Sequence, residues 1–394
     1  MGRSKKRQNK QIKNSPNTPE SLSKIKGSLT MTSKDFDSAE QSDASEHSSE
    51  GIPESLHEGT VCAKIEDFYL LKNSLDSYQL MNESQKEVIL KNIEINCKRA
   101  QYSSKIASRM FEEVKKNSLL KVTAAAVPND ILPSGYSCAL YDVRISSRGP
   151  DEKTYRQNKW IRDNVTRGLN FMQLTGKEKK FDFAIYANKK FTGGVGDEDD
   201  YQPESNDIWE EFCLDSPVNA TEVICMTKLN GEAGHFTVRK IGGEYFIIAG
   251  SKNVHMLFKT YSDIEKYTES RFMVAKTVAE AVLDAFNEME ESKLNILKHF
   301  LSTTKTTIVG ELLQPHYQHI VDLSHLKKST IYGLMLTSLP GKEDDDSLTT
   351  IPPQTCLEFF KFFGISIPEY YSISTEDVKE NILLWRYYSY LRCI

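Results

Sequence analysis

The sequence has no long hydrophobic run. Among its 394 residues, no apolar stretch approaches the roughly 18 residues that a membrane-spanning helix needs. The basic start, residues 1–14, also lacks the apolar stretch of a secretory signal. We therefore expect a protein of the cytoplasm or the nucleus that is neither secreted nor embedded in a membrane.

Cysteine is sparse, and its pattern disfavours two kinds of site. The seven cysteines lie far apart, without a C-x-x-C pair or a cluster with histidine, so we expect reduced thiols rather than a disulfide framework or a zinc site. Three catalytic patterns are missing as well: the G-x-S-x-G of hydrolases, the Walker lysine loop and the H-E-x-x-H of metalloproteases. The net charge of −5 argues against a surface coated with basic residues, although it allows a local basic groove for nucleic acid.

Composition divides the chain into four parts. Residues 1–60 are rich in Ser, Lys, Glu, Asn and Gln and poor in apolar side chains, which predicts a disordered tail. Residues 61–130 show apolar residues at helical spacing, which predicts a helical segment. Residues 131–371 form the main domain, and residues 372–394 form a C-terminal segment.

Two helices are expected in the segment 61–130. Ser84 and Glu87 have the spacing of a capping box, ahead of apolar residues that recur every three or four positions. A second helical stretch follows over 106–114. Their apolar stripes are most simply contacts with the core.

The main domain is predicted to be α+β. Alternating stretches rich in apolar residues predict strands at 137–145, 181–186, 221–227, 235–239, 244–250, 254–258, 306–312 and 331–337. One long amphipathic helix is expected over 272–286, because its apolar residues share one face. The fold class is therefore α+β, with mainly antiparallel β-sheets and packed helices, preceded by a helical segment.

The most informative segment is 221–232, which reads T-E-V-I-C-M-T-K-L-N-G-E. A predicted strand ends beside Lys228, and Asn230 and Gly231 follow it. Further strands on either side of a Gly-Gly turn would complete a meander. One interpretation is purely structural, because Asn-Gly between two strands is the strongest short hairpin signal and a nearby lysine is often a solvated edge residue.

The other interpretation is chemical. A lysine amine that attacks the α-phosphate of ATP must lose its proton, which partial burial and nearby cations favour. A strand end would hold the Lys228 amine in line with the leaving pyrophosphate. The turn at Asn230 and Gly231 would let the backbone approach the nucleotide without a Cβ in the way.

Four further segments extend the second interpretation. They are an Arg-Gly element at 166–169, a Lys-Lys-Phe element at 186–191, a Ser-Lys pair at 249–255 and a strand with a glutamate at 307–321. Together with the lysine they resemble the covalent nucleotidyltransferase superfamily, which includes ATP-dependent ligases and capping enzymes. The nearest similarity, over 131–371, is to the adenylyltransferase domain of tRNA ligases and to related RNA ligases. It implies the ATP-grasp-like nucleotidyltransferase fold of ligases.

The resemblance gives the central motif a catalytic role. Lys228 would be the adenylated nucleophile, and Asn230 and Gly231 would shape its turn and bind the nucleotide. ATP would be the nucleotide, and Mg²⁺ would be held mainly by phosphate oxygens and one or two carboxylates.

Three more residues acquire roles in the same way. Glu311 would contact the ribose or a metal, and Lys252 and Arg167 would face phosphates. Each has a plainer explanation as well, since Glu311 could be an ordinary strand-end carboxylate and Lys252 a surface residue beside a turn.

Two elements that the superfamily carries later in the chain do not appear. These are a Glu-Gly strand and, after it, two lysines one residue apart that neutralise the triphosphate. Here no Glu-Gly follows residue 59 and no K-x-K follows residue 311. Without those lysines the leaving pyrophosphate lacks part of its electrostatic stabilisation. We therefore expect either a truncated or alternative product or a degenerate pocket, and the sequence leaves open whether the chain is an active enzyme.

Three functions follow. The first is an ATP-dependent RNA ligase, in which Lys228 takes AMP from ATP and passes it to an RNA 5′-phosphate before the strands are joined. The second is a GTP-dependent mRNA-capping guanylyltransferase, although those enzymes generally carry Asp at the position of Asn230. The third is an inactive RNA-binding or scaffold relative, which the missing elements and the acidic runs 197–200 and 343–346 support. RNA is the expected partner.

Overall fold

The computed structural model describes residues 68–75, 82–146, 151–190, 219–316, 322–341 and 351–378. The predicted tail over 1–60 lies outside these ranges, as do Phe191 of the Lys-Lys-Phe element, both acidic runs and residues 379–394. None of the helices in these ranges combines the length and the apolar character of a transmembrane span.

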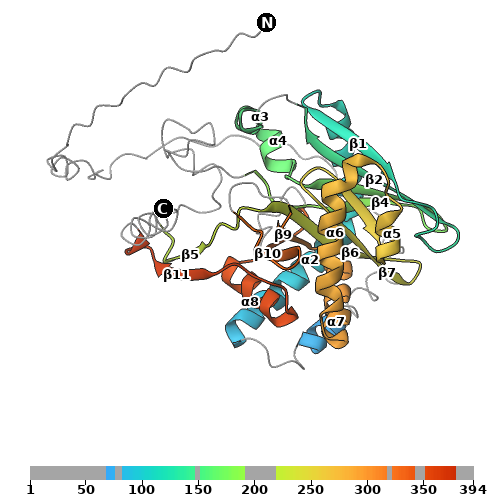
Figure 1. Cartoon of the computed structure of the whole chain (residues 1–394). Coiled ribbons are helices and arrows are strands. Elements are labelled where there is room, and N and C mark those ends of the chain that lie inside the picture. Colours follow the sequence, from blue (N-terminus) through green and yellow to red (C-terminus); the bar gives the residue numbers. More distant parts are fainter. Residues whose placement is uncertain are drawn as a thin grey trace, which may run out of the picture. The chain divides into compact units, whose positions relative to one another are not determined.

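Strands β1 to β4 form an antiparallel sheet in chain order (Figure 1). They are β1 (Leu120–Ala126), β2 (Tyr136–Ile145), β3 (Leu169–Gly176) and β4 (Lys180–Ile185). The short helices α3 (Glu152–Gln157) and α4 (Lys159–Asn164) lie between β2 and β3 in the chain. Buried residues alternate with more accessible ones along most of β2, because one face of an antiparallel sheet packs on the core.

A second antiparallel sheet has five strands in the order β10-β9-β6-β7-β8. They are β6 (Glu232–Ile241), β7 (Glu244–Gly250), β8 (His255–Phe258), β9 (Thr307–Leu313) and β10 (Thr330–Thr337). Gly242 and Gly243 form the two-residue turn between β6 and β7, with φ angles of 58° and 90°. Two-residue hairpins favour positive φ at these positions, so the predicted Gly-Gly turn is confirmed.

The predicted hairpin at Asn230 and Gly231 is wrong. β5 (Glu222–Met226) and β6 belong to different sheets, because β5 pairs with β11 (Tyr370–Ser374) in a separate two-stranded sheet. The backbone amide of Thr227 continues this pairing by donating to the carbonyl oxygen of Glu369 at 2.9 Å. The chain therefore crosses from one sheet to another between Thr227 and Gly231, in the segment that carries Lys228.

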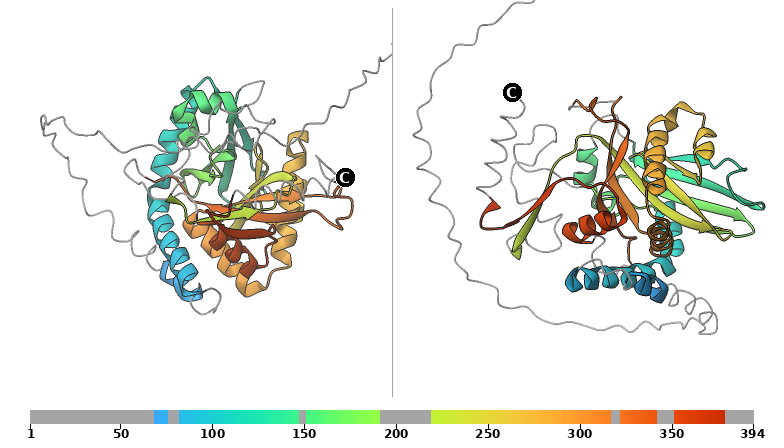
Figure 2. Two further views of the ribbon diagram at one scale, coloured as in Figure 1. Left: turned by 90° about the vertical axis from the view of Figure 1, so that its left-hand side faces the viewer. Right: turned by 60° about the horizontal axis from the view of Figure 1, so that its bottom comes forward.

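Helices pack on the five-stranded sheet and connect it to the four-stranded sheet. α6 (Met273–Asn287) contacts β6, β7 and β10, while α7 (Glu291–Thr304) contacts β6 and α8 (Pro353–Phe363) contacts β10. α2 (Glu83–Lys116) contacts β1, β4 and α7 (Figures 1 and 2). Two further short helices are α5 (Tyr261–Glu265) and η4 (Ser270–Phe272), and residues 68–75 are also helical. One large apolar cluster joins both sheets to these helices.

The long helix α2 corrects two predictions. It is a single helix of 34 residues where two helices were expected. Its N-cap is Asn82, whose side chain accepts a hydrogen bond from the Gln85 backbone amide at 2.8 Å. The predicted capping box at Ser84 and Glu87 is therefore wrong, because Ser84 already lies within the first turn.

The predicted class, α+β with antiparallel sheets and packed helices, is confirmed. Every predicted strand occurs, with small shifts at its ends, and the elements that the structure adds include β1, β3, β11 and α7. β1 lies in the segment 61–130, for which only helices are predicted, and β11 crosses the predicted limit at residue 371. The sheets therefore reach beyond 131–371 at both ends.

Buried polar contacts join β4 to the five-stranded sheet. The Arg239 guanidinium of β6 donates to the carbonyl oxygens of Phe183 at 3.2 Å and Ala184 at 2.8 Å. The backbone amide of Tyr186 donates to the Thr307 hydroxyl of β9 at 3.2 Å. We call these contacts the inter-sheet seam. They satisfy backbone groups of β4 that would otherwise be buried without a partner.

A buried ion pair lies beside the seam. The Lys305 ammonium lies 2.5 Å from the Asp182 carboxylate, and both side chains are almost fully buried. Burial alone would raise the pKa of Asp182, but the charges of Lys305 and Lys180 outweigh it and lower that pKa. Burial lowers the pKa of Lys305 to about 8 against the opposing effect of Asp182. The two residues thus hold each other in their charged forms.

Arg239→Met should lower the free energy of unfolding by about 3 kcal/mol, because two buried carbonyl oxygens and the nearby Asp182 lose a cationic partner. Urea denaturation at neutral pH measures the change. Lys121→Met on β1 is the control, since Lys121 is exposed and its replacement should change stability by less than about 0.5 kcal/mol. Equal effects of the two substitutions would contradict a structural role for the seam.

Candidate functional site

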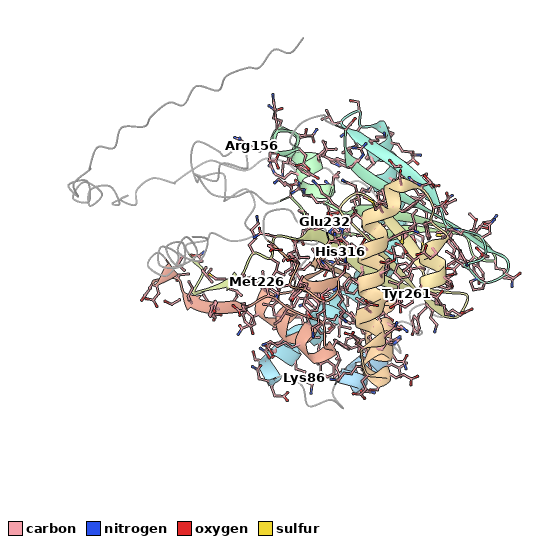
Figure 3. All side chains as sticks on the ribbon, viewed as in Figure 1. Lys86, Arg156, Met226, Glu232, Tyr261 and His316 are labelled. Atoms are coloured by element: carbon pink, nitrogen blue, oxygen red, sulfur yellow. The ribbon has the colours of Figure 1, made fainter. Side chains whose placement is uncertain are left out.

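Lys228 lies in the segment 227–231, which connects β5 to β6. Its side chain is exposed, and among the described residues none forms a hydrogen bond or an ion pair with its amine. Met226 and Glu232, which flank the segment, are labelled in Figure 3. The predicted nucleophile is therefore accessible from solvent and is not engaged in the packing of the fold.

Three features define the turn after Lys228: a backbone angle, a close approach and a hydrogen bond. Asn230 has a φ of 56°, in the left-handed region that asparagine tolerates better than most residues. A Cβ at Gly231 would lie 2.1 Å from the carbonyl oxygen of Leu312, so only glycine fits against β9. The Glu311 carboxylate accepts a hydrogen bond from the Gly231 amide at 2.8 Å. We call Lys228, Asn230, Gly231 and Glu311 the Lys228 turn. The missing side chain of Gly231 makes room for β9, a structural reason for this glycine that the sequence did not predict.

Glu311 projects from the face of the five-stranded sheet that is turned toward β4. It pairs with Ala233 of β6, so the two side chains lie on the same face. By the alternation of a strand this is also the face of Arg239, which contacts β4. Arg239 is buried, whereas Ala233 and Glu311 are half-buried. β4 therefore covers this inner face at Arg239 and leaves it partly open beside Glu311.

Arg167 and Lys252 converge on one carboxylate. Asp151 Oδ2 lies 3.3 Å from the Arg167 guanidinium and 3.1 Å from the Lys252 ammonium, and the three side chains line a cavity of about 320 Å³. Burial alone would raise the pKa of Asp151, but the two cations outweigh it and lower that pKa. We call these three residues the Asp151 clamp. Two cations this close together would suit a phosphate oxygen between them. In this structure the Asp151 carboxylate occupies that position.

The Arg-Gly and Lys-Lys-Phe elements meet at the end of β4. The Arg167 amide donates to the carbonyl oxygen of Asn188 at 2.8 Å. The Lys190 ammonium is buried and lies 2.9 Å from the Glu152 carboxylate, which follows Asp151 in the chain. Two segments predicted from the resemblance are therefore neighbours in space, and the Ser-Lys pair joins them through Lys252.

A chain of buried polar groups lies beneath the clamp. A Cβ at Gly168, which has a φ of 109°, would lie 2.4 Å from the His235 ring, so the Arg-Gly element rests directly on that ring. His235 Nδ1 lies 3.4 Å from His255 Nε2, and His255 Nδ1 lies 2.7 Å from Asp142 Oδ1. The Asn170 amide donates to the same Asp142 oxygen at 2.7 Å. Burial and the neighbouring His255 lower the pKa of His235 to about 3.

The structure thus divides the predicted site residues into two groups, the Lys228 turn and the Asp151 clamp. His235 shows how the two groups lie relative to each other. It follows Gly231 of the Lys228 turn by four residues along β6, and its ring lies against Gly168, which follows Arg167 of the clamp. Four strand residues span roughly 13 Å, so Gly231 and the His235 ring under the Arg-Gly element lie about that far apart along β6. The predicted residues are not gathered in a single cluster, and the clamp engages its own carboxylate.

Sequence reasoning missed the acidic partners of the site. Asp151 carries no motif, and only the fold brings it to Arg167, which is 16 residues away, and to Lys252, which is 101 residues away. Glu152 and Lys190 were not assigned a pairing for the same reason. In the described part of the chain, no group of three or more His, Cys, Asp or Glu side chains is arranged to hold a metal ion.

Comparison with known proteins identifies a family. The profile of a family described as a domain of unknown function (DUF7920) matches residues 139–374. The match begins within β2 and ends at the last residue of β11, so it includes the Lys228 turn and the Asp151 clamp. Searches of curated proteins and of solved structures found no match.

The lowered pKa of His235 predicts a loss of stability in mild acid. The folded value of about 3 lies below the ordinary 6.5, so the unfolded chain binds more protons between these values and stability falls as the pH drops through that window. From pH 7 to pH 5 the free energy of unfolding should fall by about 2 kcal/mol through this residue. Urea denaturation at both pH values measures it, with His235→Asn as the comparison. An equal fall in the variant would assign the effect to other groups.

Proposed function

The chain belongs to the DUF7920 family, which is described as a domain of unknown function, so we propose its function from the site itself. The proposed function is that of an ATP-dependent nucleotidyltransferase of the RNA ligase type, with Lys228 as nucleophile. The observation that carries the proposal is the hydrogen bond from the Gly231 amide to Glu311. It holds the Lys228 turn on the partly open inner face of the five-stranded sheet. One part of the competing explanation, the Asn-Gly hairpin, fails because β5 and β6 lie in different sheets.

The clamp supports the same proposal through its charge. Arg167 and Lys252 offer hydrogen-bond donors that suit phosphate oxygens, and the cavity around them is partly buried, where such contacts are stronger than in water. A triphosphate reaching from the clamp toward the Lys228 turn would bring its α-phosphate nearest the amine. We further propose that the two facing sheets correspond to the ATP-grasp-like nucleotidyltransferase fold of ligases.

The reaction proceeds in three transfers. The deprotonated Lys228 amine attacks the α-phosphorus of ATP, so that a P–N bond forms, the P–O bond to pyrophosphate breaks and the amine proton passes to solvent. An oxygen of an RNA 5′-phosphate then attacks the same phosphorus, and the P–N bond breaks to release the lysine. Finally, an RNA 3′-hydroxyl attacks the 5′-phosphate and AMP leaves, which joins the strands.

Magnesium fits this site through few protein ligands. Glu311 supplies a carboxylate oxygen of the hard type that Mg²⁺ prefers, and phosphate oxygens would supply most of the rest. Bound there, the ion would neutralise charge that develops on the phosphates. Glu311 would then both position the turn through Gly231 and face the nucleotide.

A second function is favoured by one pair of observations. Lys228 is exposed, and Asp151 already satisfies the two cations of the clamp. Both features suit a relative that binds RNA without transferring a nucleotide. Labelling separates the two functions directly.

Incubation of the full chain with α-labelled ATP and Mg²⁺ should give a labelled protein that Lys228→Ala and Lys228→Arg abolish, because neither side chain offers a nucleophilic amine at that position. Lys121→Ala, which removes an exposed lysine on β1, should be labelled like the wild type. Parallel incubation with α-labelled GTP tests the capping alternative. An unlabelled wild type that still binds RNA in a salt-dependent manner would support the inactive relative instead.

Asp151→Asn should strengthen ATP binding about three- to tenfold, because the triphosphate no longer competes with a carboxylate for Arg167 and Lys252. Isothermal titration of wild type and variant measures the Kd. Asp163→Asn is the control, since Asp163 forms an exposed ion pair with Lys159 away from the clamp. Unchanged or weaker binding in Asp151→Asn would show that the carboxylate does not occupy a phosphate position.

A further inference from the structure

A second cavity lies where α2 and α7 meet the far ends of β4 and β6. Its volume is about 360 Å³, and its walls include Ser104 of α2, Lys180 of β4, Lys240 of β6, His299 of α7 and Lys305. α2 and α7 lie side by side here (Figure 2). Among the described residues, no acidic side chain lines the cavity. A lining of ammonium, imidazole and hydroxyl groups disfavours cations and apolar ligands and favours an anion.

The groups beside the cavity carry more positive than negative charge. Asp182 does not line the cavity, but its buried carboxylate lies 2.5 Å from Lys305 and 3.7 Å from Lys180, with Arg239 close enough to interact. One negative charge thus stands among three positive ones, and Lys240 adds a fourth at the wall. Excess charge of one sign in a partly buried place is unfavourable unless a counter-ion reduces it. An anion in the cavity would supply that counter-charge.

The fold holds the cationic side chains of the cavity in place. Lys305 is the C-cap of α7 with a φ of 55°, and its ammonium also donates to the Ala100 carbonyl oxygen at 3.0 Å. At the rim, the Lys240 ammonium lies 5.6 Å from the centre of the Tyr245 ring, whose hydroxyl lies 3.5 Å from His299 Nδ1. Lys180 and Lys240 keep partly accessible side chains, so they are the cations best able to contact a ligand.

The cavity cannot share a nucleotide with the proposed catalytic site. Lys240 follows Gly231 by nine residues along β6, which corresponds to roughly 30 Å of strand. Lys180 likewise begins β4, whereas the clamp lies beyond the end of that strand. A ligand in this cavity is therefore a second molecule, or a distant part of a long one.

From these observations we infer that the cavity is a second anion-binding site, for a phosphate-bearing ligand. Compact ammonium groups together with the hydroxyl of Ser104 suit phosphate oxygens, and the volume exceeds that of about ten waters, so more than one phosphate group fits. The phosphates come either from a free polyphosphate or from the backbone of RNA. The site does not depend on the proposed nucleotidyl transfer.

The test titrates the full chain with inorganic tripolyphosphate at low salt by calorimetry. Lys180→Ala/Lys240→Ala should weaken binding at this site about tenfold or more, because two charge-assisted contacts are lost. Lys116→Ala/Lys121→Ala removes two exposed lysines that do not line the cavity and controls for the general loss of charge. Arg167→Ala/Lys252→Ala removes the cations of the clamp. Tripolyphosphate that this variant still binds is therefore bound outside the clamp.

A second pair of variants leaves every lysine in place. Ser104→Glu puts a carboxylate into the cavity and should abolish binding, whereas Ser108→Glu, one turn further along α2 on an exposed position, should not. Repeating the series with a short oligoribonucleotide identifies the source of the phosphates. If the cavity variants lose binding of RNA alone, the ligand is an RNA backbone. If they lose binding of tripolyphosphate alone, the ligand is a free polyphosphate. Either loss supports the site.

Three results would overturn the inference. They are no measurable binding of either probe to the clamp-free variant, an equal loss in both double-lysine variants, and an equal effect of Ser104→Glu and Ser108→Glu. Thermal unfolding of each variant checks that the fold is intact. Nucleotide labelling at Lys228 is measured separately, so failure of the catalytic proposal leaves this result unaffected.

Discussion

The fold depends on one buried carboxylate, Asp182, and on the cations that it requires. A carboxylate buried in an apolar interior is stable only when it is paired. Lys180 is a partner from its own strand, but two others come from outside its sheet, since Arg239 belongs to β6 and Lys305 lies between α7 and β9. Satisfying Asp182 therefore brings β4 onto the five-stranded sheet, and Arg239 continues the contact by donating to the Phe183 and Ala184 carbonyl oxygens.

The position of this seam along β4 and β6 accounts for open space at both ends. In the middle, Arg239 and its partners leave no room for a ligand, because they are buried and hydrogen-bonded. Toward the start of β6 the sheets part beside Glu311 and the Asp151 clamp, and toward its end they leave the basic cavity near Lys240. The two cavities are thus products of a single packing constraint, and the same strands that separate them also set their distance.

The sequence predicted most strands because alternation is a local signal, but it could not predict partners that the chain supplies from far away. β1 was missed because its alanines carry little strand preference, and β11 because its partner β5 lies far earlier in the chain. The Asn230-Gly231 hairpin failed for the same reason, since a strong local turn signal was overridden by a distant partner. Asp151 escaped notice because no spacing marks a residue whose neighbours lie on other elements.

Within the lysine motif, the structure distinguishes residues that the fold requires from a residue that it does not require. Gly231 is required by the Leu312 carbonyl oxygen, and Asn230 suits a left-handed φ, so both have structural reasons whether or not a nucleotide binds. Glu311 holds the Gly231 amide. Lys228 alone has no such reason, because its side chain is exposed and contacts none of the described residues through its amine. Among the described residues, packing therefore accounts for Asn230, Gly231 and Glu311 but gives no reason for a lysine at position 228.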